Sequence, residues 1–225
     1  MCYNYSRLTE RDLKMKLTTI AEALNFVGGL SSPSKMPCYS YGISAKLCDT
    51  GSKLVDIEGS TCSDCYALKG FYADWNKNIV QAHAKRVESI YKPEWVQAMV
   101  FIITKKKMTY FRWHDSGDLQ SFQHLLNIVS IADQCPSTQF WLPTREKKYV
   151  NQFSKAFGDF PKNLIVRVSA TMIDEKASDY KNTSTVHENK KPIGFACKAP
   201  SQNGKCMDCR ACWDSKVKNV SYARH

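Results

Sequence analysis

The sequence lacks the short motifs that mark several large classes of enzyme. It has no GxxxxGK(S/T) phosphate loop, no GxGxxG, no HExxH and no GxSxG. No basic segment followed by an apolar one opens the chain. The longest apolar run, Trp95 to Ile103, is far shorter than the ~20 residues that cross a membrane. We therefore expect no membrane contact and a cytoplasmic location.

Cysteine, in contrast, is abundant, since the chain has ten. In a reducing compartment, closely spaced cysteines bind metal or carry redox chemistry more often than they form structural disulfides. Positive charge is also in excess, with a formal net charge of +11. This charge favours contact with a polyanion such as nucleic acid, although a solvated basic surface also accounts for it.

The length of 225 residues and a hydrophobic fraction of 43% predict a single α/β domain over residues 1–225. Residues 1–35 are predicted to form an N-terminal helix, with helical spacing from Asp12 to Phe26. Residues 71–172 are predicted to form a βα core, beginning with two consecutive helices. Residues 36–70 and 193–225 are cysteine-rich and irregular, with short strand-like pieces at 39–43 and 54–57, and we expect them to form a metal-binding cap.

The central segment has the clearest rhythm. Strand-like runs at 108–114, 137–143 and 163–171 alternate with helical patterns at 120–132 and 146–157. This pattern predicts a mostly parallel sheet of three to five strands, either open or shaped like a partial barrel, with ligand sites at the carboxyl ends of its strands. The polar stretch 173–192 is predicted to be a surface loop or lid.

Polar residues follow each predicted strand and should share one rim. The first strand is followed by His114, Asp115, Ser116 and Asp118, the second by Thr144 and Arg145, and the third by Ser169 and Thr171. We predict His114 and Asp118 as catalytic residues, because histidine titrates near neutral pH and a carboxylate can serve as its partner. The alternative is that Ser116 or Asp118 caps the next helix.

Three arginines are candidates for binding an anionic cofactor or substrate, together with Asp115, Ser116 and Thr144. Arg145 could meet an anionic group at the rim, or form a salt bridge with Glu146 or Asp115. Arg112 and Arg167 lie inside strands, where a buried guanidinium requires an anionic partner. That partner is either a carboxylate such as Asp115 or a bound phosphate or carboxylate ligand.

The strongest signal for metal is the GKCMDCRACW segment, in which Cys206, Cys209 and Cys212 repeat at two-residue spacing, with Cys197 upstream. This run is closer to the ligation of bacterial ferredoxins than to a zinc ribbon. We therefore expect an iron–sulfur cluster, of the [4Fe–4S] type, with zinc as the alternative metal and free buried thiols as the third possibility.

A second pair, Cys62 and Cys65, lies near Cys38 and Cys48. Two arrangements fit: each half of the chain supplies its own four-cysteine centre, or the N-terminal pair completes one centre shared with the C-terminal run. Two four-cysteine centres would leave Cys2 and Cys135 free. A thioredoxin-like redox pair has the same spacing, but no strand clearly precedes this one.

The motifs MPCYSYGISAKLC, GSTCSDCYALKGFY, FRWHDSGDL, FWLPTRE and GKCMDCRACW resemble the phage gene product 88 family of phage- and plasmid-borne proteins. The resemblance implies an iron–sulfur protein in the cytoplasm of an infected bacterial host, and it names no substrate. It implies eight candidate ligands, without dividing them: Cys38, Cys48, Cys62, Cys65, Cys197, Cys206, Cys209 and Cys212.

The βα rhythm after a cysteine-rich start also looks like a partial radical-SAM barrel, but the CxxxCxxC triplet of those enzymes is missing. The sequence therefore predicts a phage-encoded iron–sulfur protein that transfers electrons to a redox partner or host protein, or a cluster-dependent enzyme acting at the His114 and Asp118 rim. The alternative is a zinc-stapled, basic nucleic-acid-binding protein. A third reading is an interacting phage protein in which the metal only holds the fold.

Overall fold

The computed structural model describes residues 17–69 and 76–224. In these residues the chain forms a seven-stranded sheet in which every neighbouring pair is parallel, in the order β1-β2-β3-β4-β5-β7-β6. The strands are β1 (Tyr39–Tyr41), β2 (Tyr110–Trp113), β3 (Gln139–Thr144), β4 (Leu164–Ser169), β5 (Thr183–His187), β6 (Phe195–Ala196) and β7 (Asn219–Ala223).

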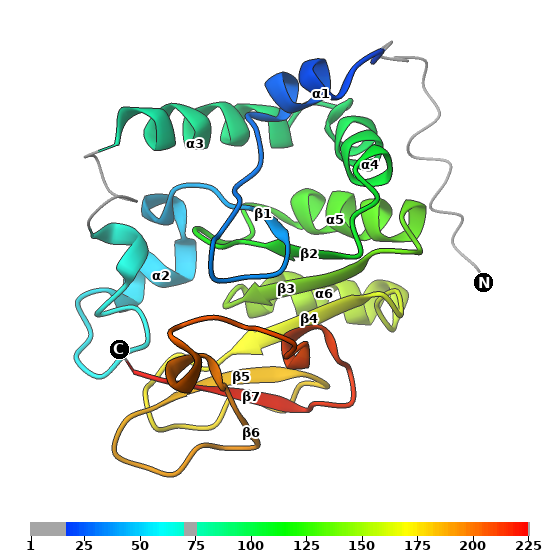
Figure 1. The fold of residues 1–225 in the computed structure, drawn as a ribbon. Helices are drawn as coiled ribbons and strands as arrows, with labels where there is room; N and C mark the ends of the chain where they lie inside the picture. The colour runs from blue at the N-terminus through cyan, green and yellow to red at the C-terminus, as the bar shows by residue number, and fades with distance from the viewer. Residues whose placement is uncertain (1–16, 70–75, 225) are drawn as a thin grey trace.

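In the described part of the chain, six α-helices accompany the sheet: α1 (Ile20–Val27), α2 (Asp49–Leu54), α3 (Lys77–Ile90), α4 (Trp95–Lys105), α5 (Phe122–Gln134) and α6 (Lys147–Phe157). The first four strands lie side by side in chain order, so right-handed crossovers place their helices on the same face. In Figure 1, α1, α3, α4 and α5 lie together on one side of the strands. The opposite face of the sheet is left for the C-terminal cysteine-rich segment.

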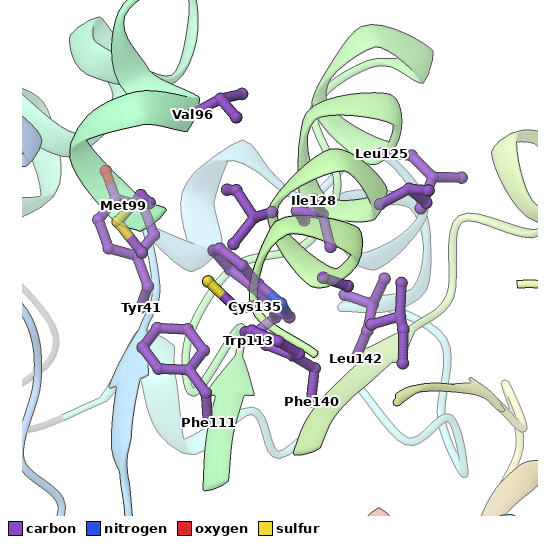
Figure 2. Close-up of a cluster of buried hydrophobic side chains, with 14 of the residues drawn as sticks. Tyr41, Val96, Met99, Phe111, Trp113, Leu125, Ile128, Cys135, Phe140 and Leu142 are labelled. Atoms are coloured by element: carbon purple, nitrogen blue, oxygen red, sulfur yellow. The ribbon is translucent and has the colours of Figure 1, made fainter. Parts of the chain in front are cut away.

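Alternation along the strands divides the two faces sharply. Phe111, Trp113, Phe140 and Leu142 are fully buried beneath α4 and α5, and Figure 2 shows them facing the helical side chains. The rings of Trp113 and Phe140 stack with their centroids 6.3 Å apart. Each such buried side chain contributes roughly 1.5–3 kcal/mol, which makes this face the main core.

Part of the other face of the sheet is covered by the dark orange segment that precedes β7 in Figure 1. The short 3₁₀ helix η6 (Ala211–Trp213) supplies Trp213, whose indole N–H donates to the carbonyl of Phe111 at 2.9 Å. Its ring packs edge-on against Tyr110 and Trp141, at centroid distances of 5.5 and 5.3 Å. The C-terminal segment is therefore packed against the sheet by aromatic contacts.

The βαβαβ centre was predicted correctly, but over residues 17–69 and 76–224 the sheet has seven strands rather than three to five. The predicted loop or lid at 173–192 is wrong, because it contains β5 in the middle of the sheet. β5 has no apolar pattern because its buried side chains meet polar ones: the Ser169 and Ser184 hydroxyls are 2.9 Å apart, and the Asn219 amide donates to Thr185 at 2.9 Å.

Two boundaries near the N-terminus also differ from prediction. The first helix begins at Ile20 rather than Asp12, because Thr19 and Glu22 form a capping box there; residues 1–16 lie outside the described part. The strand expected at 54–57 is instead the end of α2 and a turn.

The turn-like segment predicted from residue 193 onward contains β6 and β7. Among the described residues, no helix is long and apolar enough to cross a membrane.

Candidate functional site

The carboxyl ends of β2 and β3 meet at Asp118. One carboxylate oxygen accepts from the Thr144 hydroxyl at 2.6 Å and from the Leu119 N–H at 2.7 Å, and the other accepts from the Arg145 N–H at 2.8 Å. Burial raises the pKa of Asp118, while these hydrogen bonds oppose the rise. The structure brings Asp118 and Thr144 together as predicted. The Asp118 carboxylate connects the residues after β2 to the end of β3.

The helix-capping alternative is wrong for both residues that it named. Ser121 caps α5, because its hydroxyl accepts from the His124 N–H at 3.1 Å. Ser116 instead accepts the N–H of Ile43 at its backbone carbonyl, 3.0 Å away, which ties the residues after β1 to the same rim. Its hydroxyl is buried without a hydrogen-bond partner among the described residues.

His114 lies at the centre of this rim, with a left-handed φ of 52°. Its Nδ1 is 3.9 Å from Asp118 Oδ1, and neither ring nitrogen makes a hydrogen bond to the part of the protein that the structure describes. Burial and the Arg112 charge lower the pKa of His114 to about 3. The imidazole is therefore neutral at physiological pH. It packs edge-on against the His124 ring, with the ring centroids 5.5 Å apart.

Asp115 is the clearest orphan of the site. The residue is only 4% exposed, and neither carboxylate oxygen has a hydrogen-bond partner in the described residues. Its backbone carbonyl accepts from the Tyr66 hydroxyl. The first cysteine-rich segment therefore contacts the rim at Asp115. A buried carboxylate without partners is costly unless a ligand, ion or water meets it.

Buried polar atoms without partners concentrate around these strand ends. Within residues 17–69 and 76–224, those on or beside β1, β2 and β3 belong to Ser40, Arg112, Trp113, His114, Asp115, Ser116, His124, Trp141 and Glu146. Native proteins leave few such groups, and those that exist mark strain, a ligand or chemistry. The rim is therefore the candidate site on physical grounds.

The first cysteine-rich segment is fastened onto this rim by neighbouring residues at the end of β3. Arg145 donates from Nε and Nη2 to the Thr61 hydroxyl at 3.1 and 2.9 Å, and Thr61 in turn donates to the Ala170 carbonyl at 3.0 Å. Glu146 accepts the Thr50 N–H at 2.8 Å. Arg145 thus forms neither of the salt bridges predicted for it, because Thr61 occupies its guanidinium.

This docking collects Cys48, Cys62 and Cys65, which we name the N-terminal cysteine group. A Cβ built on Gly51 would lie 3.7 Å from the Cys48 sulfur and 3.8 Å from the Cys62 sulfur, and it would collide with the Cys48 Cβ at 2.8 Å. Glycine is therefore needed here because of the Cys48 Cβ, and both sulfurs lie beside Gly51. Burial is the largest effect raising the pKa of Cys48, and the neighbouring charges of Asp118, Cys65 and Cys62 raise it further.

The remaining candidate ligands form a second set, the C-terminal cysteine group: Cys38, Cys197, Cys206, Cys209 and Cys212. The Cys206 N–H donates to the Lys35 carbonyl at 2.9 Å, which brings the C-terminal run beside Cys38. Burial raises the pKa of Cys38 to about 12, with Cys206 raising it and Arg112 lowering it. Burial raises the pKa of Cys212 to about 11, and its sulfur is 3.3 Å from the Tyr222 hydroxyl.

This grouping differs from the predicted one in which Cys38, Cys48, Cys62 and Cys65 form one centre, and the division of the ligands between centres stays a prediction. Cys38 precedes β1 and Cys48 follows it, so the strand separates them toward opposite ends. The charges that act on Cys62 come from Cys65, Asp118 and Arg145 rather than from the C-terminal group. The electrostatic neighbours of Cys48 and Cys62 therefore lie within the N-terminal cysteine group and at the rim.

Arg112 occupies the space between the rim and the C-terminal cysteine group. Its guanidinium lies 4.6 Å from the centre of the Trp141 ring, and it donates to the Met36 sulfur at 3.1 Å and the His114 carbonyl at 3.4 Å. Burial lowers its pKa, and the opposing charges of Tyr66, Asp115, Tyr222 and Cys212 raise it overall. No carboxylate among the described residues forms a salt bridge with this cation.

Arg167 was predicted to meet a carboxylate or a bound anion, and that prediction is wrong. Its fully buried guanidinium donates only to backbone carbonyls, so it holds the C-terminal segment rather than a ligand. The acceptors and distances are Cys212 (3.0 Å), Thr183 (3.3 Å), Val217 (2.8 Å), Ala211 (2.8 Å) and Asp214 (2.8 Å).

Other contributors were missed by the sequence analysis. Gly51, Thr61 and Tyr66 interleave with the N-terminal cysteines, and Glu146 directly follows Arg145. Their position next to cysteines in the chain could have marked them as site residues. Their hydrogen-bond partners could not be predicted, because those partners are distant in sequence. Among residues 17–69 and 76–224, no group of three or more Cys, His, Asp or Glu side chains converges on a position for a single metal ion, and the cysteines are free of disulfides.

The fold and the site define a parallel α/β protein with two cysteine groups beside one face and one edge of its sheet. The chain matches the model of the Gene product 88 family over residues 6–215, and it belongs to that family of phage gene products. No curated protein and no solved structure matches it.

Proposed function

We propose that this protein is a phage-encoded iron–sulfur protein with two cysteine-ligated centres, which acts in electron transfer or in a cluster-dependent reaction at the rim. The observation that carries the proposal is the gathering of eight cysteines from separate stretches of the chain into two groups beside the sheet. Such gathering is not needed for packing, because the aromatic core lies on the other face.

A metal at these sites would have to displace the protons of buried thiols. Burial raises the pKa of Cys38, Cys48 and Cys212 far above neutrality, so these groups remain protonated until a cation compensates for the lost solvation. The Cys48 and Cys62 sulfurs both lie beside Gly51. Thiolates of a cubane cluster bind different iron atoms and stand farther apart than the ligands of one ion, which favours iron–sulfur over zinc.

The surroundings of the C-terminal cysteine group support the same choice. Arg112 brings a partly buried positive charge toward Cys38 and Cys212 without a carboxylate partner among the described residues. A set of metal-bound thiolates carries net negative charge and would supply the missing anion. When bound, a cluster provides one-electron transfer, while His114 and Asp115 at the rim offer a neutral imidazole and an unpaired carboxylate to a substrate.

The test is purification without oxygen, followed by iron, sulfide and zinc analysis and an absorbance spectrum. We expect a brown protein that contains iron and acid-labile sulfide and absorbs at about 400 nm. Cys135→Ala is the matched control, because Cys135 lies in the core 3.9 Å from Thr104 and should leave the metal content unchanged. Colourless protein with stoichiometric zinc would contradict the proposal.

That contrary outcome would favour the alternative of a zinc-stapled nucleic-acid-binding protein, for which the net charge of +11 is the supporting observation. Binding to DNA or RNA should then weaken steeply as salt is raised, because phosphate contacts release counterions. Absence of binding at low salt would remove this alternative.

A further inference from the structure

A pocket of about 510 Å³ lies at the other end of the sheet from the rim. It is lined by residues of β5 and β7, which lie side by side in Figure 1, and by the segments that follow β4 and β5. The strand order reverses here, because β7 lies between β5 and β6. Parallel sheets bind ligands beyond the carboxyl ends of their strands, at such reversals, in pockets of roughly 300–1,000 Å³. The pocket therefore has the place and the size of a small-molecule site.

The strands bring hydrogen-bond donors to this pocket. Thr185 and Ser221 are partners in register, and they are 3% and 0% exposed. The Thr185 hydroxyl accepts from the Asn219 amide at 2.9 Å, and no described residue accepts its own proton.

The second donor comes from a pair formed by His187 and Ser221, whose Nδ1 and Oγ atoms lie 2.8 Å apart. A neutral imidazole and a hydroxyl together carry two protons, and this contact uses only one of them, whichever atom donates. The strand side of the pocket therefore has at least two protons to offer to a ligand that accepts hydrogen bonds.

The segments around the pocket add positive charge. Three lysines line it, Lys176 after β4 and Lys190 and Lys191 after β5. Within residues 17–69 and 76–224, none of their ammonium groups forms a salt bridge. The three side chains are exposed, so each can turn toward an anion in the pocket without losing an existing ion pair.

The acidic residues of the lining do not balance this charge. Asp174 has a left-handed φ of 61°, and its carboxylate accepts the backbone N–H groups of residues 188, 189 and 190 at 2.8, 2.9 and 3.2 Å. These hydrogen bonds hold the segment that carries Lys190 and Lys191 against the segment after β4. Glu175 is then the one carboxylate of the described lining that has no such commitment, and it faces three ammonium groups.

We propose that this pocket binds the phosphate ester of a small aliphatic molecule. A phosphate group has several acceptor oxygens and a net negative charge, which suit ammonium groups and hydroxyl donors. The pocket has more room than a phosphate ion needs, and Val186 and Ile193 give its lining an apolar part. The described lining contains no phenylalanine, tyrosine or tryptophan on which a nucleotide base could stack. The inference goes beyond the proposed function and requires no cluster.

Isothermal titration calorimetry of the full-length protein at low salt tests the inference. The probes are glycerol 3-phosphate, inorganic phosphate, glycerol and AMP. We expect one glycerol 3-phosphate to bind per chain, more tightly than inorganic phosphate or AMP, and glycerol not to bind. Absence of binding by every phosphate probe overturns the inference. Inorganic phosphate binding as tightly as the ester, or AMP binding more tightly than it, also overturns the assignment to an aliphatic ester.

Variants separate this pocket from the general basic charge of the protein. The double variant Lys190→Gln, Lys191→Gln should bind glycerol 3-phosphate at least about tenfold more weakly, because charge-assisted hydrogen bonds are lost. Lys181→Gln is the matched control, since Lys181 is an exposed lysine just before β5 that pairs with Asp159 at 3.3 Å, outside the pocket. Unchanged affinity in the double variant, or an equal loss in Lys181→Gln, overturns the inference.

Thr185→Val tests the buried donor at constant charge. Valine has the shape of threonine without its hydroxyl, so this variant should bind the ester about fivefold more weakly. A urea midpoint shows that the variant folds, and full affinity in the folded variant would overturn the role of Thr185. Iron and sulfide analysis keeps this test apart from the proposed function, because binding of the ester is expected whether or not a cluster is found.

Discussion

Replacing Arg167 by methionine should release the C-terminal cysteine group while leaving the N-terminal one in place. The guanidinium is fully buried and donates five hydrogen bonds to backbone carbonyls, four of them between residues 211 and 217. Methionine fills a similar volume but donates nothing. The carbonyls of Ala211, Cys212 and Asp214 would then lose their partner in a dry environment.

The size of the effect follows from two opposing contributions. Hydrogen bonds to a charged donor are worth about 1.5–3 kcal/mol each, but removing the buried cation also removes its desolvation cost. Breaking a buried charged network from one side typically costs about 3–5 kcal/mol, and we expect that loss in the free energy of unfolding. Cys212, whose carbonyl bonds to Arg167, should lose its position with the segment.

Urea unfolding followed by tryptophan fluorescence measures the stability, and iron analysis measures the centres. Arg86→Met is the matched control, because Arg86 is also a buried arginine that donates to carbonyls, those of Gly28 and Gly42, on the helical side. It should lose stability and keep its iron. An Arg167→Met protein with unchanged stability and full iron content would refute the reasoning.

Three further predictions concern the rim and Arg112. Burial lowers the pKa of His114 to about 3 in the folded protein, whereas a histidine in the unfolded chain has a pKa near 6.5. As the pH falls from 7 to 5, only the unfolded state therefore binds this proton, and His114 lowers the free energy of unfolding by about 2 kcal/mol. Urea titrations of His114→Asn should lack that part of the pH dependence. An identical pH dependence in the variant would contradict the assignment. Arg112→Gln should lower the midpoint potential of the C-terminal centre alone, because loss of a nearby positive charge favours the oxidised cluster; a redox titration that shows no shift, or an equal shift in both centres, would count against this role. Asp118→Asn should cost about 1–3 kcal/mol, because an amide can no longer accept at both oxygens from three donors, and an unchanged urea midpoint would show that these bonds do not matter.

The sequence was a good guide where hydrophobic periodicity decides the structure. The strands around Phe111, Phe140 and Val166 were predicted because their apolar side chains alternate or run continuously in a sheet buried on both faces. The rim followed from the same pattern, since the carboxyl ends of parallel strands share one edge. Asp118, Thr144 and Arg145 accordingly meet there.

Where polar contacts decide the structure, the sequence was a poor guide. β5 looked like a loop because Ser184 and Thr185 are buried against polar partners, Ser169 and Asn219, that lie elsewhere in the chain. The partners of Arg167 are backbone carbonyls, which every residue has, so the residue types of the sequence could not indicate them.

The division of the cysteines was equally hidden from the sequence. Cys38 and Cys48 are close in the chain, but β1 lies between them, and the cysteine whose charge acts on Cys38 is Cys206. The membership of each group therefore depends on the topology of the sheet rather than on cysteine spacing.

Iron counting in two triple variants tests the central claim most directly. One variant replaces Cys48, Cys62 and Cys65 by alanine, and the other replaces Cys206, Cys209 and Cys212. If the two groups hold separate centres, each variant should keep one cluster and lose about four irons per chain relative to the unchanged protein. Loss of all iron in either variant would show one shared centre, and iron-free unchanged protein would contradict the account altogether.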